Sequence, residues 1–202
     1  MYARVAAFQN RDMGQIDGLI TTIQDRIRAG EELPGAKRFL MLIDREAGTS
    51  LGITFFENEE AIRAAEPTFE RMGDEIPEGV RGRRTSVEIY EVAIDDIADG
   101  ARAARVSSLE GSQGGIDDGI AFIREQIIPE AADLTGWRGI LTLADRQTGR
   151  AKTVTFWDGP ESLRASEARA DELRAQAADA MGDSIAGVDR YEVALHETPV
   201  TV

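Results

Sequence analysis

The chain contains no cysteine and only one histidine, His196, among its 202 residues. Without cysteine there can be no disulfide framework, no thiolate metal site and no cysteine nucleophile. A single histidine near the end of the sequence cannot build a multi-histidine metal site, and it offers serine nucleophiles no credible base. These absences predict a protein without a bound metal ion.

Long apolar runs are also missing. No stretch approaches the roughly 18 apolar residues that a membrane helix needs. The N-terminal sequence "MYARVAAFQNRD" begins on a strand-like alternation and lacks the charged region, apolar core and cleavage site of a signal peptide. We therefore expect a cytoplasmic protein with no membrane partner.

Basic residues are scarce relative to acidic ones. The 23 Lys and Arg residues are outnumbered by 37 Asp and Glu residues, which gives a formal net charge of -14. Nucleic-acid binding depends on a basic patch that neutralises phosphates, and no glycine-rich phosphate loop lies on a strand-to-helix turn. The composition argues against nucleic acids and nucleotides as partners.

What the chain does contain is an internal repeat. A shift of 101 positions aligns residues 35–94 with residues 136–195 without a gap, so that "LGITFF" meets "KTVTFW" and the last-strand phrase "YEVA" meets itself. The first strands match as well, because "ARV" occurs in both. We predict a tandem duplication with domains at residues 1–95 and 101–202, joined by a short acidic linker.

Each repeat reads as β-α-β-β-α-β. Its first helix carries a stripe of isoleucines at the spacing of one buried face, namely Ile16, Ile20, Ile23 and Ile27 in the first repeat and Ile116, Ile120, Ile123 and Ile127 in the second. Pro77 is expected to end the second helix of the first repeat. This order of elements predicts a ferredoxin-like sheet with both helices on one face.

The strand "RFLMLID" is apolar on both faces, with Phe39 and Met41 on one side and Leu40 and Leu42 on the other. Helices cover only one face, so a second layer must cover the other, and the sheet of the other repeat is the simplest candidate. We predict an α+β fold in which two tandem ferredoxin-like (βαββαβ) repeats pack as an intrachain dimeric α/β barrel. The expected state is a monomer with pseudo-twofold symmetry or a homodimer.

The stretch "GWRGILTLADRQTGRAKTVTFWDGPESLRASEA" resembles the antibiotic biosynthesis monooxygenase (ABM) domain of the dimeric α/β-barrel superfamily. The shared pattern is a Gly-aromatic-x-Gly strand entry, a hairpin, and a strand that ends in Trp-Asp before an acidic helix start. The first repeat departs from it at Phe56 and at its strand entry. The superfamily includes cofactor-free quinone-forming oxygenases, haem-degrading enzymes, isomerases and peroxidases, so the resemblance implies the fold more strongly than the chemistry.

The resemblance implies that Trp157 lines a cleft between sheet and helices. Haem-degrading relatives also use a helix histidine and a first-strand asparagine, and neither residue stands at the matching places here. We therefore expect neither haem nor another cofactor.

The face that carries Trp157 is the candidate ligand site. Pairing the second-repeat hairpin through its turn predicts Trp157 opposite Arg138, Thr155 opposite Ile140, and Thr153 opposite Thr142. A few polar groups among apolar walls suit a small molecule, and the candidate substrate-binding residues are Trp157, Thr142, Thr153, Thr155, Arg138 and Tyr191. The alternative is that Trp157 is core and that the threonines are ordinary strand residues.

The first repeat is expected to fill the matching space with Phe39, Met41 and Phe56, and so to be mainly structural. Arg63/Glu66 and Arg164/Glu167, three residues apart on a helix, read as solvated ion pairs. Asp44 and Asp145, just before the turn glycines, read as turn residues. No side chain stands out as a catalytic acid or base.

Two function hypotheses remain open. One is a cofactor-independent monooxygenase that acts on an aromatic or polyketide-like substrate. The alternative is a non-catalytic α/β barrel that binds a small molecule or has a structural role.

Overall fold

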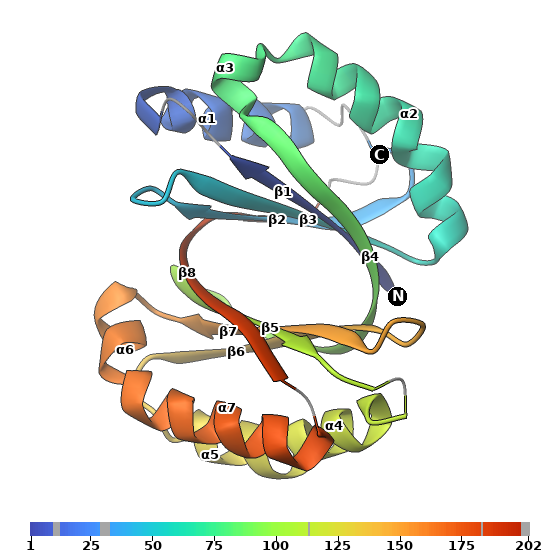
Figure 1. The fold of residues 1–202 in the computed structure, drawn as a ribbon. Helices are drawn as coiled ribbons and strands as arrows, with labels where there is room; N and C mark the ends of the chain where they lie inside the picture. The colour runs from blue at the N-terminus through green and yellow to red at the C-terminus, as the bar shows by residue number, and fades with distance from the viewer. Residues whose placement is uncertain (10–12, 29–32, 113, 183, 199–202) are drawn as a thin grey trace. The chain divides into compact units, whose positions relative to one another are not determined.

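The computed structural model describes residues 1–9, 13–28, 33–112, 114–182 and 184–198. The chain divides into two compact units, of which unit 1 comprises residues 1–89 and 193–202 and unit 2 comprises residues 90–192. In each unit helices cover one face of an antiparallel sheet (Figure 1).

The elements of unit 1 follow the predicted order, with one added short helix before the last strand. They are β1 (Tyr2–Gln9), a 3-10 turn (Met13–Gln15), α1 (Ile16–Arg28), β2 (Ala36–Asp44), β3 (Thr49–Phe56), α2 (Glu59–Glu75), α3 (Glu78–Arg81) and the first part of β4 (Arg83–Ile97). The helix α2 ends at Glu75, two residues before Pro77, as the sequence predicts.

Unit 2 repeats this order, with both of its helical segments divided. Its elements are β5 (Ala103–Glu110), α4 (Ile116–Phe122), a π-helical segment (Ile123–Ile127), α5 (Ile128–Ala132), β6 (Trp137–Asp145), β7 (Arg150–Trp157), α6 (Pro160–Ala165), α7 (Glu167–Met181) and most of β8 (Ser184–Glu197). The predicted stripe packs inward, because Ile116, Ile123 and Ile127 are buried.

The strands form a closed barrel in the hydrogen-bonded order β1-β3-β2-β8-β5-β7-β6-β4. β3 pairs antiparallel with β1 and β2, and β7 pairs antiparallel with β5 and β6. The predicted fold class, an α+β barrel built from two ferredoxin-like repeats, is confirmed.

The long strands β4 and β8 each belong to both compact units. Residues 91–97 of β4 pair with β6, and residues 184–192 of β8 pair with β5, so both of these ladders lie inside unit 2. The compact units therefore divide the chain at other residues than the expected repeats, 1–95 and 101–202. Those repeat boundaries stay a prediction about the duplication.

The register of the β6–β7 hairpin confirms two of the three predicted pairs. Ile140 lies opposite Thr155, and Thr142 lies opposite Thr153. The third pair is wrong, because Trp157 lies opposite Trp137 instead of Arg138.

A β-bulge causes that difference. The register shifts between Trp137 and Gly139, which leaves Arg138 outside the pairing. Gly139 has φ +112°, and a Cβ atom there would lie 1.9 Å from the carbonyl oxygen of Asp96 on β4. Only glycine permits this approach of two backbones. The bulge itself does not require glycine, because β2 has the same register shift between Ala36 and Arg38.

The turn prediction for Asp44 and Asp145 is confirmed. Oδ1 of Asp44 accepts hydrogen bonds from two backbone amides of its turn at 2.9 Å, and Oδ1 of Asp145 does the same at 2.9 and 3.2 Å.

Within the described ranges, no helix is both long and apolar enough to cross a membrane.

Candidate functional site

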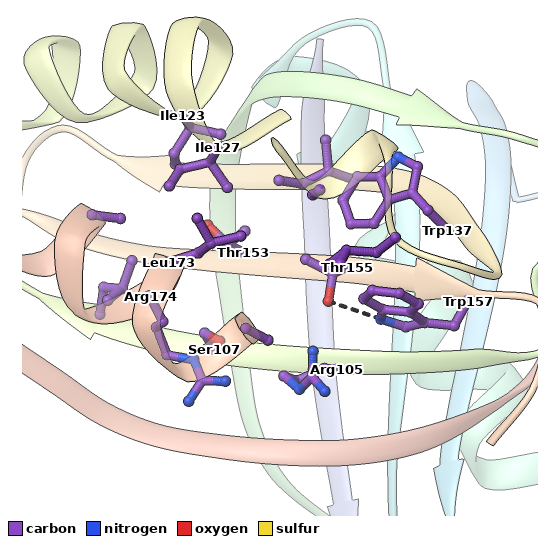
Figure 2. A pocket seen from close by; sticks show the side chains of 16 residues that line it. Arg105, Ser107, Ile123, Ile127, Trp137, Thr153, Thr155, Trp157, Leu173 and Arg174 are labelled. Carbon is purple, nitrogen blue, oxygen red and sulfur yellow. Dashed lines mark hydrogen bonds between the residues drawn. The ribbon is translucent and has the colours of Figure 1, made fainter. Parts of the chain in front are cut away.

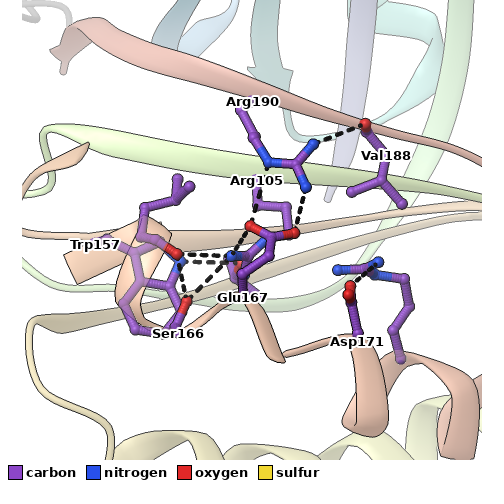
Figure 3. Close-up of polar contacts among 10 residues, drawn as sticks. Arg105, Trp157, Ser166, Glu167, Asp171, Val188 and Arg190 are labelled. Atoms are coloured by element: carbon purple, nitrogen blue, oxygen red, sulfur yellow. Dashed lines mark hydrogen bonds and ion pairs between the residues drawn. The ribbon is translucent and has the colours of Figure 1, made fainter. Parts of the chain in front are cut away.

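The centre of the candidate site is Arg105, which β5 places under the helices of unit 2. The side chain is 2% exposed. Its Nη2 donates to the carbonyl oxygen of Leu163 at 2.8 Å, to Oγ of Ser166 at 3.1 Å and to Oε2 of Glu167 at 3.0 Å (Figure 3). These acceptors lie where α6 meets α7, so one nitrogen of the guanidinium fixes the arginine to the helix layer.

Glu167 serves two arginines at once. Besides Arg105 it accepts from Nε of Arg190 on β8 at 3.2 Å, and from Nη2 of the same residue. In unit 1 Glu66 accepts from Arg4 at 3.0 and 2.8 Å. The predicted solvated pairs within the helices are therefore wrong, because both glutamates reach across to the arginine of a first strand.

Burial and charge shift the pKa values of this cluster in opposite directions. Loss of hydration lowers the pKa of Arg105, and the hydrogen bond to Glu167 partly offsets that loss. Burial by itself would raise the pKa of Glu167, but the hydrogen bonds from Arg190 and Arg105 outweigh it and hold the pKa below its usual value. At neutral pH the cluster is a charged ion-pair network.

Several polar atoms in and beside this region have no hydrogen-bond partner among the described residues. They include Nε and Nη1 of Arg105, Nη2 of Arg174 and Oγ1 of Thr153. A buried donor without a partner costs free energy of about 1–3 kcal/mol. Unsatisfied groups of this kind in a cleft wall indicate a place where a ligand or ordered water completes the bonding.

These atoms belong to the wall of a cleft between the sheet and the helices of unit 2 (Figure 2). The cleft holds about 70 Å³ of free volume. The total empty space, which includes the part of the mouth that is open to solvent, is about 620 Å³. Its polar side chains are Arg105, Ser107, Thr153, Thr155 and Arg174. The rest of the wall is apolar and includes Ile123, Ile127, Leu134, Ile140, Leu173 and two tryptophans.

The two tryptophans form one end of the cleft. Trp157 is 1% exposed, and its ring meets that of Trp137 edge to face, with centroids 5.5 Å apart and an angle of 81° between the planes. Its Nε1 donates to Oγ1 of Thr155 at 3.3 Å, and Cζ of Arg105 lies 5.7 Å from its ring centroid. Trp157 is therefore both a core residue, packed on Ala103, and part of the cleft wall.

The structure brings only part of the predicted set together. Trp157, Thr153 and Thr155 line the cleft, whereas Thr142, Arg138 and Tyr191 are not among its lining residues. Thr142 is buried beside Thr153 in the sheet. A ligand-binding role for any of the six stays a prediction.

Arg138 and Tyr191 have different surroundings. Nη1 of Arg138 donates to the carbonyl oxygen of Trp137 at 2.8 Å, and its Nη2 lies 3.8 Å from Asp158. Tyr191 is buried on β8 opposite Ala104.

Sequence reasoning missed Arg105, Arg174 and Trp137 as wall residues. One signal was available, because an arginine stands in both first strands, where a sheet covered by helices has little room for a charge. The position of Arg174 on the inner face of α7 follows from packing, and charged residues are common on such helices.

Unit 1 contains an equivalent and larger cavity. It holds about 170 Å³ of free volume, within empty space of about 1220 Å³ counted out to the solvent. The expectation that Phe39, Met41 and Phe56 fill this space is wrong. Phe39 and Met41 line the cavity, and Phe56 packs in a separate cluster with Ile62.

Two glycines account for part of the extra room in unit 1. Gly52 and Gly73 line its cavity at the positions where unit 2 has Thr153 and Arg174.

No group of three or more metal-binding side chains occurs within the described part of the chain.

No family model matches the chain. Two curated relatives come from Mycobacterium tuberculosis (strain ATCC 25618 / H37Rv). "Uncharacterized protein Rv2558" is 34% identical over 92 residues, 46% of this chain and 39% of the relative, and "Uncharacterized protein Rv2557" is 31% identical over 91 residues, 45% and 40%. The chain thus spans about two fifths of the length of the curated relatives it matches.

Solved structures match almost the whole chain. An "anthrone oxidase-like protein" has a TM-score of 0.69 at 15% identity, covering 98% of this chain and 93% of its own. A ferredoxin-fold protein related to antibiotic biosynthesis monooxygenases, from Listeria monocytogenes 4b F2365, has a TM-score of 0.55 at 9% identity, covering 95% and 94%. The heme-degrading enzyme LmHde from Listeria monocytogenes has a TM-score of 0.55 at 8% identity, covering 96% and 99%.

Haem does not fit the residues present. The described residues that line the unit 2 cleft include no histidine, cysteine or tyrosine to hold the iron. Met41 and Met72 line the unit 1 cavity, but methionine holds haem iron together with histidine, and His196 does not line that cavity. The closed barrel and these likenesses agree on the fold, and the chain has the α/β-barrel fold of these solved structures.

Proposed function

We propose that the chain is a cofactor-independent monooxygenase whose unit 2 cleft receives the reacting ring of a hydroxylated aromatic or polyketide-like compound. The observation that carries the proposal is the guanidinium of Arg105, buried at 2% exposure with Nε and Nη1 lacking partners among the described residues. The fold shared with an anthrone oxidase-like protein supports the same reaction class.

The cleft suits a planar anion. A phenolate or enolate oxygen placed beside Arg105 would accept the unused N–H groups in an environment where loss of water strengthens the bonds. Trp157 and Trp137 offer aromatic surfaces for a flat ring. The free volume of about 70 Å³ admits the reacting edge of a ring system, and the wider part of the cleft admits the remainder.

In this reaction the electrons come from the substrate anion itself. Stabilising the anion favours its reaction with O₂, in which one oxygen atom enters the carbon skeleton and the other leaves as water. For anthrone the balance is C₁₄H₁₀O + O₂ → C₁₄H₈O₂ + H₂O. The chain's own residues hold the oxyanion, orient the ring and exclude bulk water.

A second candidate, binding without turnover, has one observation in its favour. The described lining of the cleft includes no carboxylate, histidine or tyrosine that could remove a proton from the substrate. A compound whose proton must be removed by the protein would then be held and not converted. Arg105 would in that case act only as an anion anchor.

The test uses anthrone with the purified full-length chain. We expect O₂ consumption in a one-to-one ratio to anthraquinone formed, at a rate above spontaneous oxidation and resistant to chelators. Arg105→Met should lower the rate about 10²-fold, the order seen when one oxyanion donor is removed. Arg164→Met, which removes an exposed arginine from α6, is the matched control and should keep the rate.

The outcomes separate the two candidates. The non-catalytic binder would be favoured if anthraquinone quenches tryptophan emission, Arg105→Met abolishes the quenching, and no O₂ is consumed. A role of this cleft would be refuted if the chain showed no quenching and no turnover. It would also be refuted if turnover persisted in a folded Arg105→Met variant.

A further inference from the structure

The cavity of unit 1 is the larger of the two clefts and has a different chemical character. It lies between the sheet β1-β3-β2 and the helices α1 and α2. Its free volume of about 170 Å³ exceeds the roughly 150 Å³ of an apolar protein cavity that binds benzene. The space is therefore sufficient for an organic ligand without movement of the wall.

The apolar part of the wall combines aliphatic and methionine side chains with three phenylalanines, Phe8, Phe39 and Phe69. Leu19, Ile23 and Ile27 project from α1, Met41 lies on β2 and Met72 on α2. Methionine has three rotatable bonds and a polarisable sulfur, so such a wall adapts to a chain-like ligand. The described lining of the unit 2 cleft has two indole rings and no methionine, so its wall adapts less.

All four charged residues of the lining are arginines, namely Arg4, Arg26, Arg81 and Arg84, and none of the described lining residues is acidic. Arg4 is bound by Glu66, and Arg26 by Glu75 at 2.8 Å. Arg81 donates to the carbonyl oxygen of Ile76 at 3.2 Å. The remaining member, Arg84, is exposed at the start of β4.

Glu66 and Glu75 neutralise two of the four arginines, so the lining keeps an excess of positive charge in a chain whose formal net charge is -14. Guanidinium groups recognise carboxylates through paired N–H donors. An apolar interior combined with a cationic lining matches a molecule that has an aliphatic tail and one anionic head.

We infer that the unit 1 cavity is a second ligand site, which binds a medium-chain aliphatic carboxylate with its tail among the isoleucines and methionines and its carboxylate at the arginines. The site is independent of the proposed oxidation, because it shares no residue with the unit 2 cleft. The chain would then bind two ligands of different chemistry, one in each repeat.

The experiment titrates sodium decanoate into the full-length chain and measures heat by calorimetry. Both tryptophans of the chain, Trp137 and Trp157, line the unit 2 cleft. We therefore expect saturable heat with no change in tryptophan emission. Decan-1-ol, which has the same tail and no charge, should bind at least 10-fold more weakly.

Two variants locate the ligand. Gly73→Leu fills the cavity from α2, where a Cβ atom would lie 3.9 Å from Arg81, so the backbone accepts the change and decanoate affinity should fall at least 10-fold. Gly18→Leu makes the same substitution on an exposed position of α1 and should leave the affinity unchanged. Leucine has the higher helix propensity, so neither variant is expected to unfold.

Arg84→Gln removes one cation from the lining and should weaken decanoate about 3- to 10-fold while leaving decan-1-ol unaffected. Arg63→Gln, an exposed change on α2 outside the lining, is its control. The inference is overturned by the absence of heat at millimolar decanoate, by affinity that survives Gly73→Leu, by equal binding of acid and alcohol, or by a tryptophan signal that tracks the heat.

Discussion

Arg4 and Arg105 occupy the same place in the two repeats and have different surroundings. Arg4 uses Nε and Nη2 together on the two oxygens of Glu66, at 3.0 and 2.8 Å, and its Cζ lies 3.9 Å from the ring centroid of Phe69. Arg105 binds through Nη2 alone and lies 5.7 Å from the ring centroid of Trp157.

The substitutions around the two arginines explain the difference. Phe69 stacks on Arg4, whereas the second repeat has Ala170 at the matching position. Glu66 serves Arg4, whereas Glu167 is shared between Arg105 and Arg190. The comparison teaches that two units with the same order of elements can use a matching arginine differently, as a structural anchor in one and with unused donors in the other.

The largest expected effect concerns the strand entry that differs between the repeats. Gly139→Ala would place a Cβ atom 1.9 Å from the oxygen of Asp96, at φ +112°, so we expect a loss of at least about 3 kcal/mol in unfolding free energy or failure to fold. Urea denaturation followed by circular dichroism measures it.

The matched position in the first repeat is Arg38, whose Cζ lies 4.0 Å from the ring centroid of Phe55. Arg38→Ala should cost only about 1 kcal/mol, as expected for a lost cation–π contact and some packing. The strand β2 has the same bulge with Arg38 in place of the glycine. Equal losses at the two positions would therefore show that the close approach of Gly139 to Asp96 does not demand glycine.

The two arginines themselves should differ in their effect on stability. Arg4→Met breaks a buried, bidentate pair and an aromatic contact, and we expect a loss of about 2 kcal/mol, less than for a fully buried pair because Glu66 is 39% exposed. Arg105→Met removes three hydrogen bonds but also two unsatisfied donors, and we expect a loss of about 1 kcal/mol. Chemical denaturation of both variants side by side decides the order, and a reversed order would contradict the assignment of anchor and donor.

Trp157→Phe tests whether the second repeat tolerates the residue of the first. Because Trp157 is 1% exposed and packs on Trp137, we expect a loss of about 1–2 kcal/mol and a lower melting temperature as well as weaker binding of aromatic ligands. Decanoate affinity at unit 1 is the internal control and should not change. An unchanged melting temperature would mean that the indole is not part of the core.

The smallest effect is on acid stability. The hydrogen bond from Arg4 holds the pKa of Glu66 below its usual value, and Arg190 and Arg105 do the same for Glu167 against the effect of burial. A carboxylate with a lowered folded-state pKa stabilises the fold fully above its unfolded pKa of about 4.5, and that contribution is lost as the pH falls through the folded value.

Glu66→Gln and Glu167→Gln should therefore flatten the fall in stability between about pH 5 and pH 2, each by less than about 1 kcal/mol because both carboxylates are partly exposed. Urea midpoints measured over this range test the sign. A steeper acid limb in either variant would contradict it.

Much of the architecture was predictable because it depends on repeated local patterns. The isoleucine stripes, Pro77 and the turn aspartates each act within a few residues, and the doubly apolar strands require a second covering layer. The hairpin pairs were predictable down to Thr155. They were not predictable beyond Gly139, because counting pairs from the turn does not allow for the extra residue of a β-bulge.

The site was less predictable for a similar reason. Arg105 and Glu167 are 62 residues apart, and Glu66 is as far from Arg4, so helix spacing pointed to the wrong partners. Cavity volume is a difference between the space available and the side chains that fill it. The sequence prediction counted the side chains of Phe39 and Met41 and did not count the volume left empty by the missing side chains of Gly52 and Gly73.

The shared strands β4 and β8 bear on how this gene can change. Residues 91–97 of β4 complete the ladder with β6 in unit 2, while residues 193–197 of β8 belong to unit 1. A deletion or recombination event that removes either half of the gene would leave the surviving half without a strand end that it needs. Neither half of the chain therefore contains every strand segment of its own compact unit.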